Sequence, residues 1–368
     1  MKTYAIPMVP GPVRVPEKIS STYRTDYGSG DLENDYFDLY DRTRQKLQRI
    51  LGTTEDVVIQ SGEGMLALWS ALKSCILPGD RVLAVSTGVF GTGIGEMARA
   101  VQADVQWVEF RYNETIHDLD RIESAVAAFK PKMITAVHCE TPSGTLNPID
   151  GLGQIKKARN VPLLYVDAVA SAGGTRVQAD KWQVDLCLGG SQKCLSCPPD
   201  MSFVSVSQNA WDIIARVNYS GYDALKPFRH AVTERFFPYT PNWHGTASLH
   251  TGAQLLLTEG LETCFQRHAA VAQDCRRRLS EMGIELYPAA DAIPSPTVSA
   301  AKVPTGFTWE TWDAALRRRG LVVGGSLGPL AGKIFRLGHM GSQAETTLLD
   351  KALAVIEEAL LQKRSRSE

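Results

Sequence analysis

Two short stretches decide the fold, Leu163-Leu-Tyr-Val-Asp167-Ala-Val-Ala170 and Gly189-Gly-Ser-Gln-Lys193. Each begins as a short apolar run typical of a buried strand and ends in one polar side chain, Asp167 or Lys193. In an open α/β sheet, ligands bind at the carboxyl ends of the strands, so we expect the two side chains at one edge of a sheet. A carboxylate buried there needs a partner, because an unpaired buried charge is costly.

Apolar runs alternate with helical patterns on both sides of these stretches. The expected strands are residues 57–60, 81–85, 105–110, 133–138, 163–166, 185–188 and 202–206. The expected helices are residues 31–51, 117–129 and 150–159, with two more beginning near Gly64 and Gly91. This alternation predicts an α/β fold with a mostly parallel sheet covered by helices on both faces.

The pattern changes after about residue 249. One long helical run, 251–282, leads to strand-like segments at 284–287, 298–303, 321–323 and 334–337, flanked by helices at 309–319 and 345–361. Because 368 residues are too many for one core, we expect two unequal domains. The predicted parts are a Pro-rich N-terminal arm (1–16), a large cofactor- and substrate-binding domain (17–255) and a small C-terminal α+β domain (256–368).

Composition excludes several classes of function. The formal net charge of −1 gives no electrostatic reason to expect nucleic acid or a membrane surface as a partner. The N-terminus lacks a signal peptide, and the seven cysteines show no disulfide framework, so a cytoplasmic protein is expected. Cys194 and Cys197, three residues apart without a second pair, give poor evidence for a metal site, and we predict none.

An aspartate and a lysine at two strand ends suit pyridoxal chemistry. The lysine amine forms a Schiff base with the aldehyde, and the carboxylate keeps the pyridine nitrogen protonated so that the ring accepts electrons. The alternative is a structural ion pair, or two unrelated loop residues. The spacing of Asp167 and Lys193 does not decide between these interpretations.

Several motifs in the same order along nearly the whole chain resemble the class V aminotransferases of fold type I. The resemblance is to the branch that holds the alanine–glyoxylate, serine–glyoxylate and pyridoxamine–pyruvate enzymes. It implies the fold of that group, with a mostly parallel seven-stranded sheet in the large domain. It also implies small-molecule substrates and a homodimer or homotetramer with active sites at the subunit interface. The motifs are Pro10-Gly-Pro, Ser61-Gly-Glu-Gly, Thr141-Pro-Ser-Gly-Thr-Leu-Asn-Pro, Val166-Asp-Ala-Val-Ala-Ser, Gly190-Ser-Gln-Lys-Cys-Leu-Ser-Cys-Pro-Pro and the segment from Gly325 to Gly338.

The same resemblance assigns roles to individual residues. It implies that Lys193 forms the Schiff base and transfers the proton, with Asp167 as the partner of the ring nitrogen. It implies that Arg336 binds the substrate carboxylate by a two-pronged contact, although alone this residue could be a surface ion pair. Gly11 is assigned to the same substrate site. The remaining implied residues bind the cofactor, with Thr240 reaching the other subunit's site: Glu63, Gly64, Phe90, Thr141, Val169, Gln192 and Thr240.

Glu63 departs from the family pattern, which has a serine in this turn to hold the cofactor phosphate. A carboxylate about 4 Å from a phosphate would cost on the order of 4 kcal/mol per charge pair at an effective dielectric near 20. Met65 adds no donor, and the resemblance places Phe237 at the position of a phosphate-binding tyrosine that reaches across the dimer in relatives. The pyridoxamine–pyruvate enzymes show the same pattern of a glutamate and a phenylalanine. This resemblance implies an enzyme that moves an amino group between unphosphorylated pyridoxamine and a keto acid such as pyruvate, giving pyridoxal and L-alanine. Alternatively, Glu63 points away and complements the helix dipole.

Other residues leave further alternatives open. Leu327 stands where pyridoxamine–pyruvate enzymes carry a second arginine, and Gln192 matches the phosphate-using enzymes better. A pyridoxal 5'-phosphate-dependent alanine– or serine–glyoxylate aminotransferase is therefore the second hypothesis. A non-catalytic B6-binding protein is the alternative from another class. Asp200 replaces a glycine usual in the family, and the sequence gives no interpretation of it.

Overall fold

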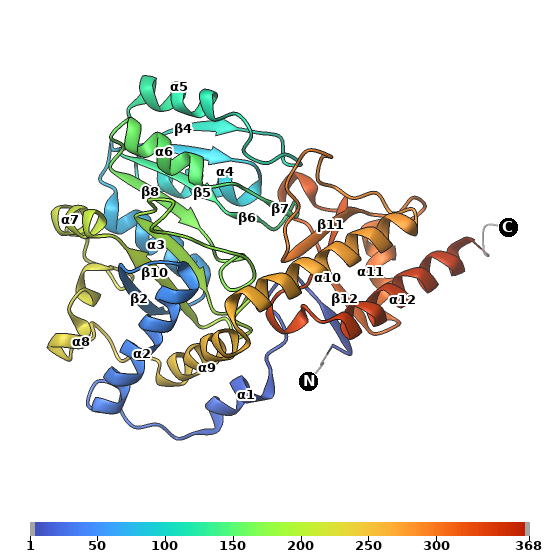
Figure 1. Ribbon diagram of the computed structural model, residues 1–368, viewed down its shortest axis with the longest axis horizontal. Helices are drawn as coiled ribbons and strands as arrows, with labels where there is room; N and C mark the ends of the chain where they lie inside the picture. Colours follow the sequence, from blue (N-terminus) through green and yellow to red (C-terminus); the bar gives the residue numbers. More distant parts are fainter. Residues whose placement is uncertain (1–3, 365–368) are drawn as a thin grey trace.

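A seven-stranded sheet forms the centre of the larger part of the molecule in the computed structural model, which describes residues 4–364 (Figure 1). The strand order is β2-β10-β9-β8-β5-β3-β4, and β10 alone runs antiparallel to its neighbours. The predicted α/β class with a mostly parallel sheet is confirmed. The strands are β2 (Asp56–Ser61), β3 (Arg81–Ser86), β4 (Asp104–Glu109), β5 (Met133–Val137), β8 (Leu163–Asp167), β9 (Leu186–Gly190) and β10 (Met201–Val206).

Burial on both faces explains why these strands are continuous apolar runs. Every residue of β5, β8, β9 and β10 is buried, as expected for a sheet covered by helices. The helix α3 packs on β9 and β10, and α4 packs on β3 and β4. The helices of this part are α1 (Glu17–Ser20), α2 (Asn34–Leu51), α3 (Gly64–Cys75), α4 (Val89–Ala100), α5 (Leu119–Phe129), α6 (Asp150–Ala158), α7 (Gln208–Val217), α8 (Ala231–Glu234) and the short turns η1 (Ser21–Arg24) and η2 (Lys226–Phe228).

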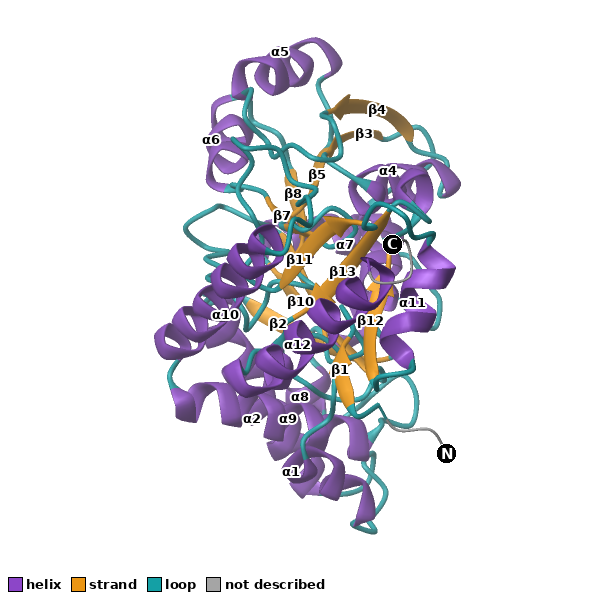
Figure 2. Cartoon of the chain, turned by 90° about the vertical axis from the view of Figure 1, so that its right-hand side faces the viewer, coloured by secondary structure: helices purple, strands orange, loops and turns teal. Residues whose placement is uncertain are grey.

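A four-stranded sheet, ordered β1-β12-β13-β11, forms the smaller part, with α10 and α12 crossing in front of it in Figure 2. Its core gathers around the fully buried Trp312 and Phe335. The elements are β1 (Ile6–Met8), β11 (Val298–Lys302), β12 (Leu321–Gly325), β13 (Ile334–Gly338), α10 (Leu261–Glu281), α11 (Trp309–Arg317), α12 (Thr346–Arg364), η3 (Gly328–Leu330) and η4 (Gly341–Gln343). A separate small ribbon pairs β6 (Cys139–Glu140) with β7 (Thr145–Leu146).

Two expectations for the C-terminal half are wrong. The helical run 251–282 is two helices, α9 (Trp243–Glu259) and α10, because Gly260 between them has a φ of 87°, which helical backbone does not allow. Residues 284–287 form no strand and make only one isolated bridge, between Leu286 and Ala301. The boundaries 1–16, 17–255 and 256–368 stay a prediction.

The N-terminal arm is fastened to the small sheet before it reaches the large one. Its strand β1 pairs in parallel with β12. Beyond β1, the Gln343 side chain donates hydrogen bonds to the carbonyl oxygens of Val9, at 2.8 Å, and Gly338, at 2.7 Å. A Cβ at Gly338 would lie 2.2 Å from the carbonyl oxygen of Val9, so only glycine fits there. The arm then crosses to the large part, where the Val13 amide donates to the Gln192 carbonyl oxygen at 3.1 Å.

We expect Gly338→Ala to lower the free energy of unfolding by about 1–3 kcal/mol, because the new methyl group meets backbone that cannot move freely. Gly93→Ala is the matched control. A Cβ there meets nothing within 4 Å, and alanine in the helix α4 should stabilise the protein by about 0.5–1 kcal/mol. Urea unfolding followed by circular dichroism measures both changes. Equal stability of the two variants would contradict the close packing of the arm on β13.

Candidate active site

A cavity at the carboxyl ends of the central strands brings most of the predicted site residues together. Asp167 is the last residue of β8, and Lys193 follows the end of β9 by three residues. The lining is completed by Met65 and by three residues for which the sequence predicted no role, Leu68, Cys139 and Ala170. Eight predicted residues line this cavity: Glu63, Gly64, Phe90, Thr141, Asp167, Val169, Gln192 and Lys193.

Lys193 is held in the cavity by the N-terminal arm. Its Nζ donates a hydrogen bond to the Pro10 carbonyl oxygen at 3.0 Å, and a Cβ on Gly11 would lie 2.5 Å from the same nitrogen. Gly11 has a φ of 102°, so glycine is required there both for the backbone and for the lysine. Burial lowers the pKa of Lys193, and the nearby Arg336 lowers it further, although Asp167 opposes them. These effects favour the neutral amine, which is the nucleophilic form.

Asp167 is a buried carboxylate without a cationic partner in ion-pair contact among the described residues. Its Oδ1 accepts a hydrogen bond from the Val169 amide at 2.8 Å. Burial raises its pKa to about 6, with a further contribution from Glu63, while that amide and Lys193 lower it. A buried carboxylate without a cationic partner suits a ligand that carries a positive charge, such as a protonated ring nitrogen.

Glu63 faces the cavity at the N-terminus of α3. Its side chain makes no capping hydrogen bond to that helix, and its Oε2 accepts a hydrogen bond from Gln192 Nε2 at 2.7 Å. Gln192 Oε1 is buried and has no hydrogen-bond partner within residues 4–364. Gly64 lets the turn approach closely, since a Cβ there would lie 2.9 Å from Val169 Cγ1. The alternative in which Glu63 points away from the site therefore loses support.

Arg336, on β13 of the small sheet, does not line the cavity but lies near enough to Lys193 to lower its pKa. Only 8% of its surface is exposed, and its Nε and Nη2 donate to the Gly325 carbonyl oxygen at 2.8 Å and 2.5 Å. Burial lowers its pKa to about 10, against the opposing effect of Glu140. No described carboxylate lies within ion-pair distance of the guanidinium. Such a buried cation with donors to spare is suited to a ligand carboxylate.

Two residues expected near a second subunit lie elsewhere on this chain. Thr240 is exposed and does not line the cavity, so its predicted role across an interface stays a prediction. Phe237 is only 6% exposed, and its ring packs against Tyr36, Phe37 and Tyr40 of the same chain. These contacts lie within one chain, so the predicted place of Phe237 near a partner subunit's site stays a prediction.

Asp200, which the sequence left without an interpretation, fastens the turn that carries Glu63. Its carbonyl oxygen accepts from the Gly62 amide at 2.8 Å, and its Oδ2 accepts from the Tyr23 hydroxyl and from Asn242 Nδ2, the latter at 3.3 Å. The residue joins the N-terminal segment, the loop before α9 and the Glu63 turn. Its role is structural support of the cavity.

His339 is a core residue, not a ligand contact. It is fully buried, its Nε2 lies 2.9 Å from Ser299 Oγ, and its Nδ1 lies 3.0 Å from the Pro296 carbonyl oxygen. Leu327, in contrast, is 45% exposed on the loop before β13. Neither residue lines the cavity around Lys193.

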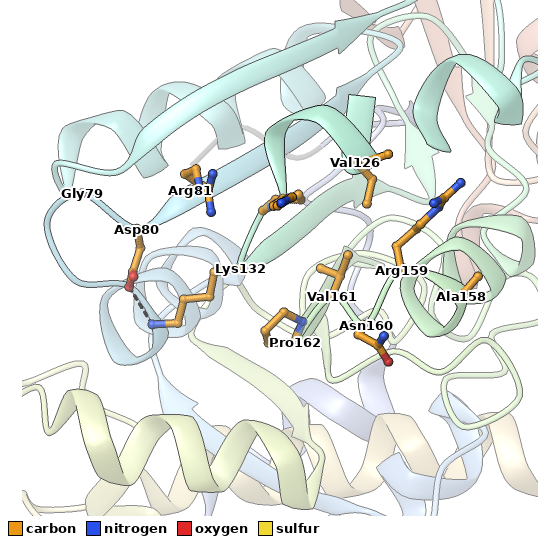
Figure 3. Close-up of a pocket in the computed structure, with 13 residues that line it drawn as sticks. Gly79, Asp80, Arg81, Val126, Lys132, Ala158, Arg159, Asn160, Val161 and Pro162 are labelled. Carbon is orange, nitrogen blue, oxygen red and sulfur yellow. Dashed lines mark hydrogen bonds and ion pairs between the residues drawn. The ribbon is translucent and has the colours of Figure 1, made fainter. Parts of the chain in front are cut away.

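A larger hollow of about 710 Å³ lies at the opposite edge of the sheet, where β3, β5 and β8 begin (Figure 3). Lys132 and Asp80 form an ion pair there at 2.6 Å, and Arg159 pairs with Glu123 at 2.9 Å. The helices α5 and α6 end beside it, and basic residues near helix C-termini are stabilising in any protein. Of its two lysines, Lys130 is exposed and Lys132 is held by Asp80, which is itself not buried, so the size of the hollow does not make it the active site.

Within residues 4–364, none of the helices is long and apolar enough to cross a membrane. No group of three or more histidine, cysteine, aspartate or glutamate side chains there is arranged to hold a metal ion.

The family model for class V aminotransferases matches residues 10–332. An uncharacterised aminotransferase of Methanocaldococcus jannaschii is 35% identical over 96% of this chain and 92% of its own length. The pyridoxamine–pyruvate transaminase of Mesorhizobium japonicum is 32% identical over 88% of this chain and 83% of its own length. Among solved structures, the alanine–glyoxylate aminotransferase from Nostoc sp. superposes with a TM-score of 0.93 at 26% identity, covering 98% of this chain and 96% of that one.

We expect Asp167→Asn to stabilise the ligand-free protein at pH 8. The pKa of Asp167 is about 6 in the folded chain and about 3.9 in an unfolded one, so the native state retains a proton that the unfolded state releases between these values. The carboxyl group therefore makes stability fall as pH rises through this window, and asparagine removes the effect. The gain should be on the order of 2 kcal/mol at pH 8 and should shrink below pH 6, measured by urea unfolding.

Asp185→Asn is the control for this measurement. Asp185 is equally buried but pairs with Lys156 at 2.6 Å, so its replacement should destabilise the protein at pH 8. An Asp167→Asn variant that is less stable than the wild type at pH 8 would show that Asp167 is already compensated.

Proposed function

Because the chain belongs to the class V aminotransferases, we propose that it transfers an amino group between unphosphorylated pyridoxamine and a small 2-keto acid such as pyruvate. The products are pyridoxal and L-alanine. The observation that carries this proposal is the contact between Glu63 and Gln192 at the N-terminus of α3. A relative named as a pyridoxamine–pyruvate transaminase supports it.

The Glu63–Gln192 pair acts against a phosphate at this end of the cavity. A helix N-terminus attracts an anion, but here the residue before the helix, Glu63, carries its own carboxylate and lines the cavity. The Gln192 amide group, a donor that a phosphate could use, is bonded to that carboxylate. Repulsion of about 4 kcal/mol would weaken phosphate binding roughly a thousandfold. A hydroxymethyl group, in contrast, can donate a hydrogen bond to Glu63.

The other cavity residues fit a B6 ring. An aromatic wall from Phe90 and an aliphatic one from Val169 suit a flat ring, and Asp167 supplies an uncompensated negative charge. A bound pyridoxal or pyridoxamine supplies a protonated ring that draws electrons from the reacting carbon. Asp167 keeps the proton on the ring nitrogen. Lys193, whose pKa is lowered by burial, would take a proton from the pyridoxamine carbon that bears the amino group and deliver a proton to the keto-acid carbon on the other side of the shared nitrogen.

Assembly is part of the proposal. We expect a homodimer or a higher homo-oligomer in which the exposed Thr240 reaches the active site of the partner subunit. This expectation rests on the resemblance to the family.

The second candidate is a pyridoxal 5'-phosphate-dependent alanine–glyoxylate aminotransferase. Gln192 favours it, because its buried Oε1 has no partner and a reorientation of the side chain would free the amide group for phosphate. The likeness to the Nostoc enzyme also favours it. A spectrophotometric assay of pyridoxamine with pyruvate, glyoxylate and oxaloacetate in parallel compares the two. Absence of turnover in this assay, and also with L-alanine and glyoxylate in the presence of pyridoxal 5'-phosphate, together with binding of pyridoxal, would favour a non-catalytic B6-binding protein.

We expect the wild type to bind pyridoxal more tightly than its phosphate, and Glu63→Ser to reverse the order. Loss of the carboxylate should improve phosphate-ester affinity by about 100- to 1,000-fold, measured by equilibrium dialysis. Glu63→Gln is the control, since it removes the charge but keeps the size, and it should give most of the gain. Tight retention of the phosphate by the wild type, without turnover of free pyridoxamine, would contradict the proposal.

We expect Arg336→Gln to raise KM for pyruvate about 100-fold or more, because the carboxylate loses a charged two-pronged partner. Pyridoxal affinity in the absence of keto acid should change little. Arg276→Gln is the matched control, because Arg276 is a half-buried arginine whose Nη1 donates to the Ser295 carbonyl oxygen at 2.8 Å. It should lower stability and leave KM unchanged. An equal rise in KM in both variants would exclude a direct carboxylate contact by Arg336.

A further inference from the structure

Glu140 is a fully buried carboxylate beside the cavity to which the proposed reaction gives no role. It ends β6, and its exposed fraction is 0%. Its chain neighbours Cys139 and Thr141 both line the cavity, while the Glu140 side chain turns away toward α4. A buried carboxylate is costly unless it is well hydrogen-bonded, so its contacts need an explanation.

Both carboxylate oxygens of Glu140 bind the first turn of α4. Oε1 accepts from the Phe90 amide at 2.8 Å, and Oε2 accepts from the Gly91 amide at 3.1 Å. Amides in the first turn of a helix have no partner within the helix, and a negative charge is favoured at that end. The residue before the helix, Gly88, has no side chain that could cap it. The cap therefore comes from a residue about fifty positions later in the chain.

Two glycines at the start of α4, Gly88 and Gly91, make room for this arrangement. A Cβ at Gly88 would lie 2.3 Å from Glu140 Cγ and 2.5 Å from its Cδ. Gly88 has an extended backbone, with a φ of 178°, so its conformation alone does not require glycine. At Gly91, a Cβ would lie 2.9 Å from the Cα of Ser86. The glycine at 88 leaves room for the Glu140 side chain, and the one at 91 lets the helix begin close to β3.

The groups around Glu140 shift its pKa in opposite directions. Burial raises its pKa to about 7 and Asp167 raises it further, whereas the amides of Phe90 and Gly91 and the guanidinium of Arg336 lower it. No described cation forms an ion pair with it. The helix amides are thus its direct partners.

We propose that Glu140 is a positioning residue that sets the Phe90 ring in the cavity wall. One carboxylate joins the first turn of α4, which carries Phe90, to the strand end that carries Thr141. The Glu140 side chain therefore fixes the Phe90 side of the cavity relative to the Thr141 side. This inference rests on the proposed B6-ring site, and it holds whether or not the ring carries a phosphate.

The test is Glu140→Gln, studied by direct binding of pyridoxal with isothermal titration calorimetry. The amide oxygen of glutamine accepts from one helix N–H, but its NH₂ group then faces the other. Affinity should fall about tenfold or more, equivalent to at least about 1.4 kcal/mol. Asp185→Asn is the control. It also removes a buried carboxylate that accepts a backbone N–H, from Leu164 at 2.8 Å, but at the opposite end of the sheet, and it should leave pyridoxal affinity unchanged.

A double-mutant cycle separates positioning from general loss of stability. Phe90→Leu alone should weaken pyridoxal binding, and Glu140→Gln added to it should cost less than about threefold more, because the ring that Glu140 positions is gone. Additive effects in the cycle would overturn the proposal, and so would equal losses in Glu140→Gln and Asp185→Asn. If Glu140→Gln does not fold, Gly88→Ala displaces the carboxylate and should give the same loss of affinity.

Hydrogen exchange of the ligand-free protein gives a readout that does not depend on the proposed function. The amides of Phe90 and Gly91 should exchange about tenfold faster or more in Glu140→Gln, with little change in the amide of Leu164. Unchanged exchange at both positions would overturn the role of Glu140. A wild type that binds neither pyridoxal nor its phosphate would instead contradict the proposed function, and the exchange data would still decide whether Glu140 holds the first turn of α4.

Discussion

Burial of charge at the carboxyl ends of β8 and β9 is the constraint on which the site depends. Burial raises the pKa of Asp167 and lowers the pKa of Lys193 and of Arg336, so each group is displaced toward its neutral form. Within the described residues, none of the three makes an ion pair that would offset this cost. The folded chain therefore holds uncompensated groups at defined positions, and a ligand with a cationic ring and a carboxylate supplies the missing partners.

Holding these groups in place requires close approach of backbone segments from distant parts of the chain. Gly11 lies against Lys193, and Gly64 lies against Val169. The Pro10 carbonyl oxygen, which accepts the hydrogen bond from Lys193, belongs to the N-terminal arm. This arm is attached to the small sheet by β1 and Gln343. The position of the lysine is thus set jointly by the large sheet, from which it extends, and by the small sheet, to which its hydrogen-bond acceptor is attached. Arg336 lies on that same small sheet, so the sheet positions both the acceptor of the Lys193 hydrogen bond and the buried guanidinium.

The sequence predicts those features that local pattern or strand ends determine. Buried parallel strands are continuous apolar runs, which explains why all seven strands of the large sheet were expected. Gly260 was missed because an isolated glycine within a helical pattern is often tolerated. The pairing of β1 with β12 joins residues more than 300 positions apart, and nothing in three residues indicates it. Glu140 was missed for the same reason, since the helix that it caps lies about fifty residues earlier.

The position of Glu63 also bears on how long a ligand stays bound. The N-terminus of α3 favours one negative charge, which either the chain or the ligand can supply. When the ligand supplies it as a phosphate, the ionic contact holds a cofactor through many reaction cycles. When the chain supplies it as Glu63, the fold keeps that stabilisation whether the cavity is filled or empty. The ligand then gains at this end only the hydrogen bond from its hydroxymethyl group to the Glu63 carboxylate, worth about 1.5–3 kcal/mol. Such an arrangement suits a vitamin that enters as one substrate and leaves as a product in each cycle.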